Sequence, residues 1–272
     1  MALLAALAAT AHPLTSAQAQ TLPAAQATLP ASAGPVDAAA LDDLVAAGRI
    51  LVDQGVLDGF GHVSMRHPKD PTRFLMSRSL APALTTSADI IEHDLDGQGI
   101  AANGRTLFLE RFIHAEIYRA RPDVMAIVHC HSPPLIPFSV STVPMKAMFH
   151  NSAFLAAGVP VFEIRNAAGG PPAMTDMLVS TPALGKALAA ALGDKAVALM
   201  RGHGAVITAP TVPLVVFRAV YTEVNARMQQ QAIALGGPYI TLEPEEGIKA
   251  DKINAIISAR PWDVWKKKAM AH

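Results

Sequence analysis

Cysteine is almost absent from this chain of 272 residues, because Cys130 is the only one. A disulfide within the chain is therefore impossible, and so is a zinc module built from several thiolates. A metal ion would have to be bound by histidine and carboxylate side chains. An excess of either charge is also missing, since 22 basic residues balance 22 acidic ones and the longest basic run is Lys266–Lys268. Nucleic acids attract clustered positive charge, so no nucleic-acid partner is expected.

Charged residues are missing altogether from residues 1–36. Residues 1–10 are largely apolar, and Ala17-Gln18-Ala19 resembles the cleavage site of a secretory signal, but the basic residues that normally open such a signal are absent. Two interpretations stay open: the export signal of a periplasmic protein, or a disordered low-complexity segment ahead of a cytoplasmic enzyme. An apolar run of about ten residues is too short for a bilayer, so no membrane span is expected.

Helix and strand patterns alternate along the rest of the chain. Apolar residues at helical spacing predict helices over residues 36–54, 110–121, 181–192 and 211–235. Short apolar segments predict strands over residues 61–65, 73–76, 126–128, 159–164 and 196–200. With 51% apolar residues the chain can fill a complete core. We therefore predict one folded domain over residues 37–243 and a C-terminal tail of one or two helices over residues 244–272.

Two histidines follow an apolar strand in the segment Val-His-Cys-His, which ends at His131. Side chains alternate along a strand, so His129 and His131 point to one side and Cys130 to the other. His203 follows a second apolar strand between two glycines, which allow a close approach of the backbone. A His-x-His pair by itself is as often structural. Three neutral imidazoles, however, leave a divalent cation an open position, as in catalytic zinc sites, and we predict one ion per chain, Zn or Mn first, with Fe or Co as alternatives.

Several motifs, in order, resemble those of the class II aldolase/adducin family over about residues 41–235. These are the Gly-His-Val-Ser turn that ends at Ser64, a Glu-x-x-x-His helix start at Glu110 and His114, an Arg-Pro-Asp triplet before the His-x-His pair, and the His-Gly pair at His203. The resemblance implies an α/β fold, a three-layer α/β/α sandwich around a central mixed or antiparallel sheet. It also implies a homotetramer with active sites near subunit interfaces, and Glu110 as an acid/base or an exchangeable fourth metal ligand.

The phosphate-binding motifs of the family's sugar-phosphate aldolases are altered in this chain. His62 replaces the asparagine of a Gly-Asn-Val-Ser turn, Arg78 and Ser79 stand in a Met-Ser-Arg-Ser segment instead of Thr-Pro-Ser-Gly, and a Leu-Phe-Leu run replaces the serines before Glu110. Phosphate needs several hydrogen-bond donors, whereas a flat aromatic carboxylate needs apolar walls and an Arg or His for its oxygens. We therefore predict a small-molecule carboxylate substrate, bound by His62, Arg78 and Ser79.

Three segments look most like those of metal-dependent decarboxylases of hydroxypyridine dicarboxylates and dihydroxyphthalates: residues 58–64, 109–114 and 149–151. The resemblance implies a lyase that decarboxylates a hydroxylated aromatic or heteroaromatic dicarboxylate, with Glu110 or His150 as the acid that reprotonates carbon. Three alternatives stay open. They are an aldolase for a non-phosphorylated hydroxy-carbonyl substrate, a non-haem iron oxygenase, and a non-catalytic adducin-like module, although the retained histidines and Glu110 disfavour the last.

Overall fold

The computed structural model describes residues 31–169 and 175–271. The expected N-terminal segment therefore lies, as far as residue 30, outside the described residues. The described strands form an eight-stranded sheet in the order β4-β3-β2-β1-β5-β8-β7-β6. The strands are β1 (His62–Arg66), β2 (Arg73–Ser77), β3 (Ile90–Asp94), β4 (Gly99–Ile100), β5 (Ala126–Cys130), β6 (Val161–Phe162), β7 (Val197–Met200) and β8 (Gly204–Ala209). Neighbouring strands are antiparallel except for the parallel pair of β6 and β7, so the sheet is mixed.

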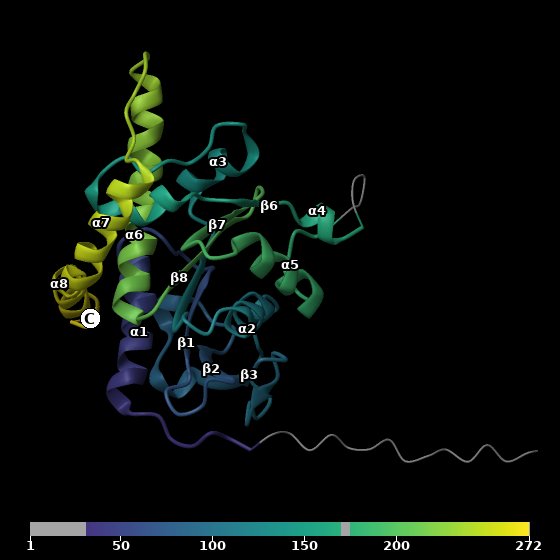
Figure 1. Ribbon diagram of the computed structural model, residues 1–272. Helices are drawn as coiled ribbons and strands as arrows, with labels where there is room; N and C mark the ends of the chain where they lie inside the picture. The colour runs from purple at the N-terminus through teal and green to yellow at the C-terminus, as the bar shows by residue number, and fades with distance from the viewer. Residues whose placement is uncertain (1–30, 170–174, 272) are drawn as a thin grey trace, which may run out of the picture. The chain divides into compact units, whose positions relative to one another are not determined.

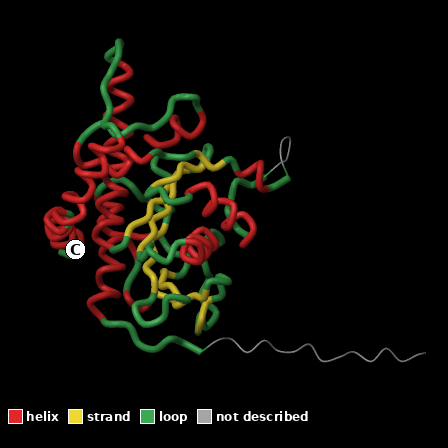
Figure 2. The backbone as a smooth tube through the Cα atoms, in the orientation of Figure 1, coloured by secondary structure: helices red, strands yellow, loops and turns green. Residues whose placement is uncertain are grey.

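Helices cover both faces of this sheet, which confirms the three-layer α/β/α arrangement (Figure 1). One face carries α1 (Ala38–Asp53) and α6 (Val212–Ala234), and the other carries α2 (Arg111–Ala120) and α5 (Pro182–Leu192). Figure 2 shows the strands running between these two groups of helices. The C-terminal tail forms α7 (Pro244–Ile257) and α8 (Ala259–Ala269), and Trp262 of α8 is buried against the α1 and α6 layer. No helix in the described ranges is both long and apolar enough to cross a membrane.

Side-chain alternation along the central strands divides the core into two layers. On β5, Val128 and Cys130 lie in the cluster that includes α1 and α6, whereas Ile127 lies in the cluster under α2 and α5. His129 follows the parity of Ile127 and so faces the α2 side. Cys130 is completely buried, and burial raises the pKa of its thiol to about 12, so it behaves as a small apolar residue.

The helices begin where the sequence supplies a cap. Asp37 accepts a hydrogen bond from the backbone N–H of Ala39 at the start of α1. Thr181 and Thr211 cap α5 and α6 in the same way, and each is followed by a proline in the first turn. All four predicted helices start within two residues of the expected position, and these caps account for three of the four starts.

The strands were predicted less completely than the helices. The expected strand over residues 159–164 is reduced to the two residues of β6, because the short helix α4 (Ile164–Ala167) begins at Ile164. Strands β3, β4 and β8 were not predicted. β3 carries Glu92 and His93 among its five residues, which weakens any apolar pattern. β8 begins directly after His203. This region was used only to predict His203, between its two glycines, as a metal ligand, and no strand was predicted there.

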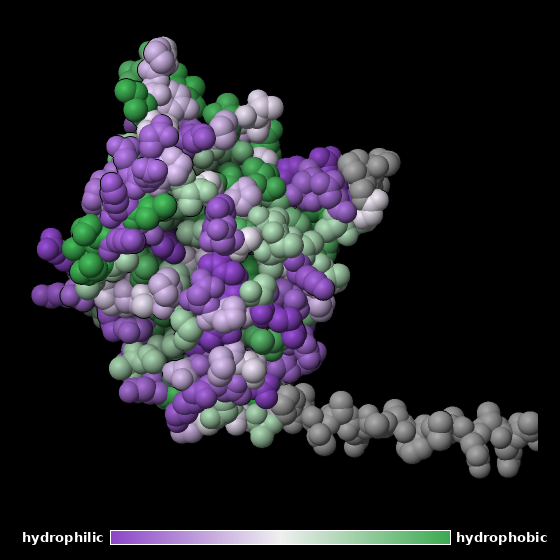
Figure 3. Space-filling model, viewed as in Figure 1, coloured by the Kyte–Doolittle hydropathy of each residue, from purple (hydrophilic) through white to green (hydrophobic). Residues whose placement is uncertain are grey.

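Hydrophobic side chains also reach the surface around the far end of α6 (Figure 3). Leu235, which caps α6, is 86% exposed, and Ile240 in the segment that leads to α7 is 94% exposed. Exposed apolar residues are common on protein surfaces, and these two lie away from the metal cluster described below.

Gly204 allows β8 to pass close to the end of β5, so we expect Gly204→Ala to destabilise the protein. A Cβ at this position would overlap the carbonyl oxygen of Cys130 and crowd the Cα of His131. The expected loss is about 1–3 kcal/mol in the free energy of unfolding, measured by chemical denaturation. Gly59→Ala is the matched control, because its Cβ would meet no atom within 4 Å, and a change above about 0.5 kcal/mol is not expected there. Equal stability of the two variants would contradict this account of the close approach.

Candidate metal centre

Four side chains from three separate parts of the chain converge near the ends of two central strands of the sheet. His129 is on β5, His131 is one residue beyond its end, and His203 lies in the turn between β7 and β8. Because β5 and β8 are paired, with Cys130 opposite Ala205, the end of one strand lies beside the start of the other. Glu110 precedes the first turn of α2, which packs over the same sheet face. The structure therefore brings together the three predicted ligands and the predicted acid.

The ligating atoms of the four residues lie within 4.8 Å of one another. Nε2 of His131 is 3.0 Å from Nε2 of His129 and 3.0 Å from Nε2 of His203. Oε2 of Glu110 is 3.4 Å from Nε2 of His129 and 3.5 Å from Nε2 of His203. The three Nε2 atoms and Oε2 of Glu110 therefore surround one small volume.

Backbone carbonyls determine which nitrogen of two of these rings carries a proton. Nδ1 of His129 donates to the carbonyl oxygen of Ala205 at 3.1 Å, and Nδ1 of His203 donates to that of Met177 at 2.8 Å. In the neutral rings the Nε2 atom of each is then unprotonated and offers a lone pair. Nε2 of His131 lies between them and can donate to only one. Unpaired nitrogen lone pairs this close repel one another, and a cation removes the repulsion, so this donor set fits a divalent metal ion.

Glu110 is held by its other oxygen. Oε1 accepts a hydrogen bond from the backbone N–H of Val179 at 2.9 Å, which leaves Oε2 directed toward the histidines. Burial alone would raise the pKa of Glu110, but positive charge on the imidazoles of His129 and His203 outweighs burial and holds the pKa well below its usual range. When these rings are neutral, a cation bound between them would keep Glu110 ionised in the same way. The contact with Glu110 outweighs burial at His203 and raises its pKa. Glu110 is therefore a carboxylate before any substrate binds.

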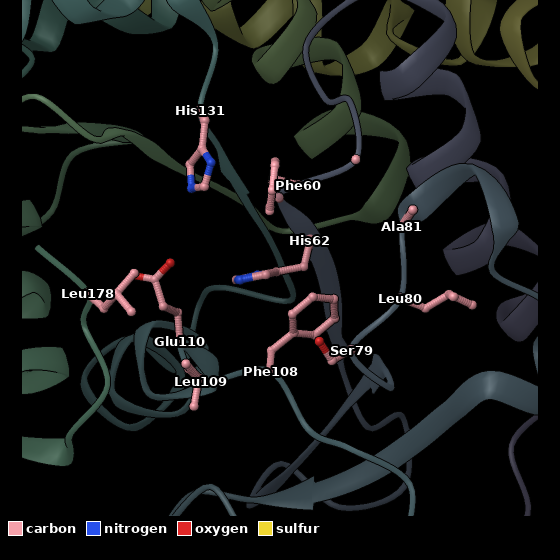
Figure 4. A pocket seen from close by; sticks show the side chains of 12 residues that line it. Phe60, His62, Ser79, Leu80, Ala81, Phe108, Leu109, Glu110, His131 and Leu178 are labelled. Atoms are coloured by element: carbon pink, nitrogen blue, oxygen red, sulfur yellow. The ribbon is translucent and has the colours of Figure 1, made fainter. Parts of the chain in front are cut away.

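A cavity of about 460 Å³ opens beside this cluster (Figure 4). His62, Glu110 and His131 are the ionisable side chains of its wall, and Ser79 adds a hydroxyl. The other large side chains are apolar, and they are Phe60, Leu80, Phe108, Leu109 and Leu178. The ring of Phe108 lies against that of His62, with centroids 4.6 Å apart. The cavity thus has the mainly apolar wall and few polar groups of a small-molecule site.

Two of the predicted site residues, Arg78 and His150, do not line this cavity. Arg78 forms an ion pair with Asp89 at 2.6 Å and is not part of the cavity wall, although its neighbour Ser79 is. His150 is exposed at the start of the turn-rich segment η4 (His150–Ala157), where Nδ1 contacts the side chain of Asn151. The roles assigned to Arg78 and His150 stay predictions.

Sequence reasoning missed several residues around the cavity. Leu178 has no motif that marks it, and Phe60 was singled out only as part of the segment 58–64, since apolar residues in loops are common. His114 was noted only as part of a motif, yet it contacts His62 directly behind the cavity. Its position four residues after Glu110 was a usable signal, because one helical turn separates the two side chains.

The chain is similar to known proteins along most of its length. Residues 42–230 match the family described as the Class II Aldolase and Adducin N-terminal domain. The decarboxylase tropJ of Talaromyces stipitatus is 33% identical over 239 residues, which cover 80% of this chain and 90% of that protein. A 3,4-dihydroxyphthalate decarboxylase of Arthrobacter keyseri is 31% identical over 211 residues, which cover 74% of this chain and 81% of the relative.

Solved structures show the same fold. An L-fuculose 1-phosphate aldolase from Glaciozyma antarctica superposes with a TM-score of 0.68 at 24% identity, covering 87% of this chain and 93% of the other. An aldolase II superfamily protein from Pseudomonas syringae superposes with a TM-score of 0.69 at 21% identity, covering 86% of this chain and 94% of the other. At these identities the likeness concerns the fold alone.

Replacing any one ligand should release the metal, which gives a direct test of the centre. We expect His129→Ala, His131→Ala and His203→Ala each to weaken divalent-metal affinity at least about 100-fold, because a lost ligand costs more than a lost outer hydrogen bond. Elemental analysis after dialysis, with zinc titration, would measure this. His150→Ala is the matched control and should keep about one ion per chain, since this histidine lies outside the cluster. Full metal content in all three variants would sink the assignment.

Proposed function

Because the chain belongs to the class II aldolase and adducin family, we propose that it is a metal-dependent lyase that decarboxylates a hydroxylated aromatic or heteroaromatic dicarboxylate. The observation that carries this proposal is the apolar cavity that ends at the Glu110 and histidine cluster. The relatives named as decarboxylases support it, among them the 3,4-dihydroxyphthalate decarboxylases. The chain is an enzyme of the carbon–carbon lyase class, and the substrate class is the proposed part.

The cavity wall supports a flat aromatic acid over a sugar phosphate. Phe60, Phe108 and Leu109 offer apolar surface for a ring. A phosphate dianion would need several donors, and in the described part of the chain the wall offers the hydroxyl of Ser79 and the ring of His62 beside acceptor groups. A substrate ring with two carboxylates and a hydroxyl is complementary to this cavity, because its ring can contact the apolar wall while its polar groups meet the few polar side chains.

We assign His129, His131 and His203 as the ligands of one divalent ion, Zn or Mn by preference and Fe or Co as alternatives. When bound, the ion stabilises negative charge on a substrate oxygen next to the carbon that loses CO2. Decarboxylation and retro-aldol cleavage share this requirement. A metal centre of the same kind therefore serves aldolases and decarboxylases on one fold.

Glu110 moves the proton in this proposal. Its Oε2 faces the ion site while its Oε1 is held by Val179, so Oε2 takes the proton of the ring hydroxyl when the substrate binds. Glu110 starts as a carboxylate, which is the form that can accept a proton. Oε2 then passes this proton to the ring carbon that bears the departing carboxylate, and the electron pair of the breaking carbon–carbon bond moves into the ring toward its oxygen as CO2 leaves. Glu110 is a carboxylate again at the end, so no proton is gained or lost by the enzyme. His62 and Ser79 bind the substrate.

His150 is the alternative acid, and it would act across a subunit boundary. The residue is exposed and outside the cavity of its own chain. We propose a homotetramer in which a neighbouring subunit covers the mouth of the cavity. Phe60 and Leu109, which are 68% and 62% exposed at that mouth, support such a cover, because large apolar side chains there would otherwise face water.

The first test is CO2 release from a panel of dihydroxyphthalates and hydroxypyridine dicarboxylates. We expect metal-dependent turnover, and we expect Glu110→Gln to lower kcat by about 100-fold or more while the metal stays bound, as loss of general acid/base catalysis does. His150→Gln tests the alternative acid in the same assay. A fall in kcat for His150→Gln and none for Glu110→Gln would exchange their roles.

Two other outcomes would replace the decarboxylase with a different function. Release of an aldehyde from a non-phosphorylated hydroxy-carbonyl substrate without CO2 release from the aromatic panel would establish an aldolase. Oxygen consumption with an iron-loaded enzyme would establish an oxygenase. Absence of bound metal together with none of these activities would favour the non-catalytic adducin-like module.

A further inference from the structure

A chain of four buried side chains runs from the interior to the cavity wall. The phenol oxygen of Tyr118 is 2.8 Å from Oγ of Ser64, and that oxygen is 2.6 Å from Nδ1 of His114. Nε2 of His114 is 2.7 Å from Nδ1 of His62, which lines the cavity. Tyr118 and His114 lie on the inner face of α2, and Ser64 and His62 lie on β1. None of the four is more than 4% exposed.

Hydrogen-bond counting determines the direction of this chain. Among the residues that the structure describes, the phenol of Tyr118 has Ser64 as its sole partner, so its proton must go to Oγ of Ser64. Ser64 then gives its own proton to Nδ1 of His114. The single proton of a neutral His114 is therefore on Nε2 and is donated to Nδ1 of His62. His62 carries its proton on Nε2.

Every other arrangement leaves a buried hydroxyl proton without an acceptor. If His62 donated from Nδ1 to His114, then His114 would donate to Ser64, and the proton of Ser64 or that of Tyr118 would have no partner. A positive charge on either ring leads to the same misfit, because the charged ring has protons on both nitrogens. Buried donors without acceptors are strongly disfavoured. Burial also lowers the pKa of His62 and His114 well below the ordinary value, which agrees with two neutral rings.

We propose that Tyr118, Ser64 and His114 are positioning residues that fix His62 in its Nε2–H tautomer, so that the cavity offers a neutral hydrogen-bond donor to an anionic oxygen of the substrate. In the described part of the chain Nε2 of His62 has no protein partner, and the ring reaches into the cavity toward Glu110 (Figure 4). The hydrogen bond from Nε2 of His62 to a carboxylate of the substrate rests on the proposed function, whereas the tautomer of His62 does not.

A neutral donor has a specific advantage beside a cation site. A protonated imidazole would repel the ion and would be drawn to Glu110, whereas a bare nitrogen would repel a carboxylate oxygen of the substrate. The Nε2–H form does neither, and a neutral imidazole can still polarise an oxygen that gains negative charge. Phe108 packs against the ring and limits its rotation, so the donor keeps one direction.

The tautomer can be measured without any activity. In zinc-loaded full-length protein with ring-labelled histidine, two-bond proton–nitrogen correlations distinguish a protonated Nε2 from a protonated Nδ1, and His62→Gln identifies the signals of His62. We expect the Nε2–H form to exceed the Nδ1–H form by about tenfold or more, given the cost of an unpaired buried donor. A dominant Nδ1–H signal for His62 would overturn the proposal.

Variants of His114 separate positioning from packing. In His114→Gln the amide can still donate to His62 and accept from Ser64, so we expect the Nε2–H signal and most of kcat/KM to remain. In His114→Leu the donor is lost, and we expect both tautomers of His62 and a fall of about tenfold in kcat/KM with the metal retained. His93→Leu is the matched control, because His93 also stacks on Phe74 but makes none of the hydrogen bonds of the chain. Equal losses for His114→Gln and His114→Leu would reduce His114 to packing.

The two proposals fail separately. CO2 release together with an Nδ1–H signal would leave the decarboxylase standing and remove the positioning chain. An Nε2–H signal without CO2 release from any aromatic acid would keep the chain and remove the proposed substrate class.

Discussion

The pairing of β5 with β8 is the constraint on which the metal centre depends. This pairing places Cys130 opposite Ala205, so His131 and His203 emerge side by side from the end of one strand and the start of the next. The carbonyl of Ala205 also accepts the Nδ1 proton of His129. One pair of strands therefore both gathers the histidines and sets which nitrogen of His129 faces the ion site. A shift in register by one residue would lose both effects, because it would turn His129 to the opposite face.

The sequence was sufficient to predict the parts of the site that rest on local rules. Alternation along a strand placed His129 and His131 on one side and Cys130 on the other, and helical spacing together with Asp37 located α1. The motif resemblance supplied the sandwich and the link between distant segments. Contacts that depend on tertiary packing could not be predicted in this way. The sequence gives no reason for Arg78 to pair with Asp89, or for Leu178 to reach the cavity.

Near the site, aromatic and histidine rings pack between the sheet and α2. His93 stacks on Phe74 at 4.9 Å between centroids, Phe74 faces His114 at 6.3 Å, and His62 lies 4.8 Å from His114 and 5.1 Å from His129. Buried ring nitrogens without partners are costly. Ser64, itself bonded to Tyr118, and His62 give both nitrogens of His114 a partner, whereas Nε2 of His93 has none among the described residues. The packing of α2 and the chemistry of the cavity wall therefore depend on the same side chains around His114.

The two oxygens of Glu110 have different roles because they have different hydrogen-bond partners. A carboxylate with both oxygens free near three imidazoles would bind the ion through either oxygen and would have no fixed direction for a proton. The backbone N–H of Val179 occupies Oε1 and thereby leaves Oε2 as the atom that faces both the ion site and the cavity. Together with a donor at His62, the cavity then has one fixed acceptor and one fixed donor on the apolar wall. A substrate with an acidic hydroxyl beside a carboxylate is complementary to that pair, whereas a phosphate, which only accepts, would meet repulsion at Oε2.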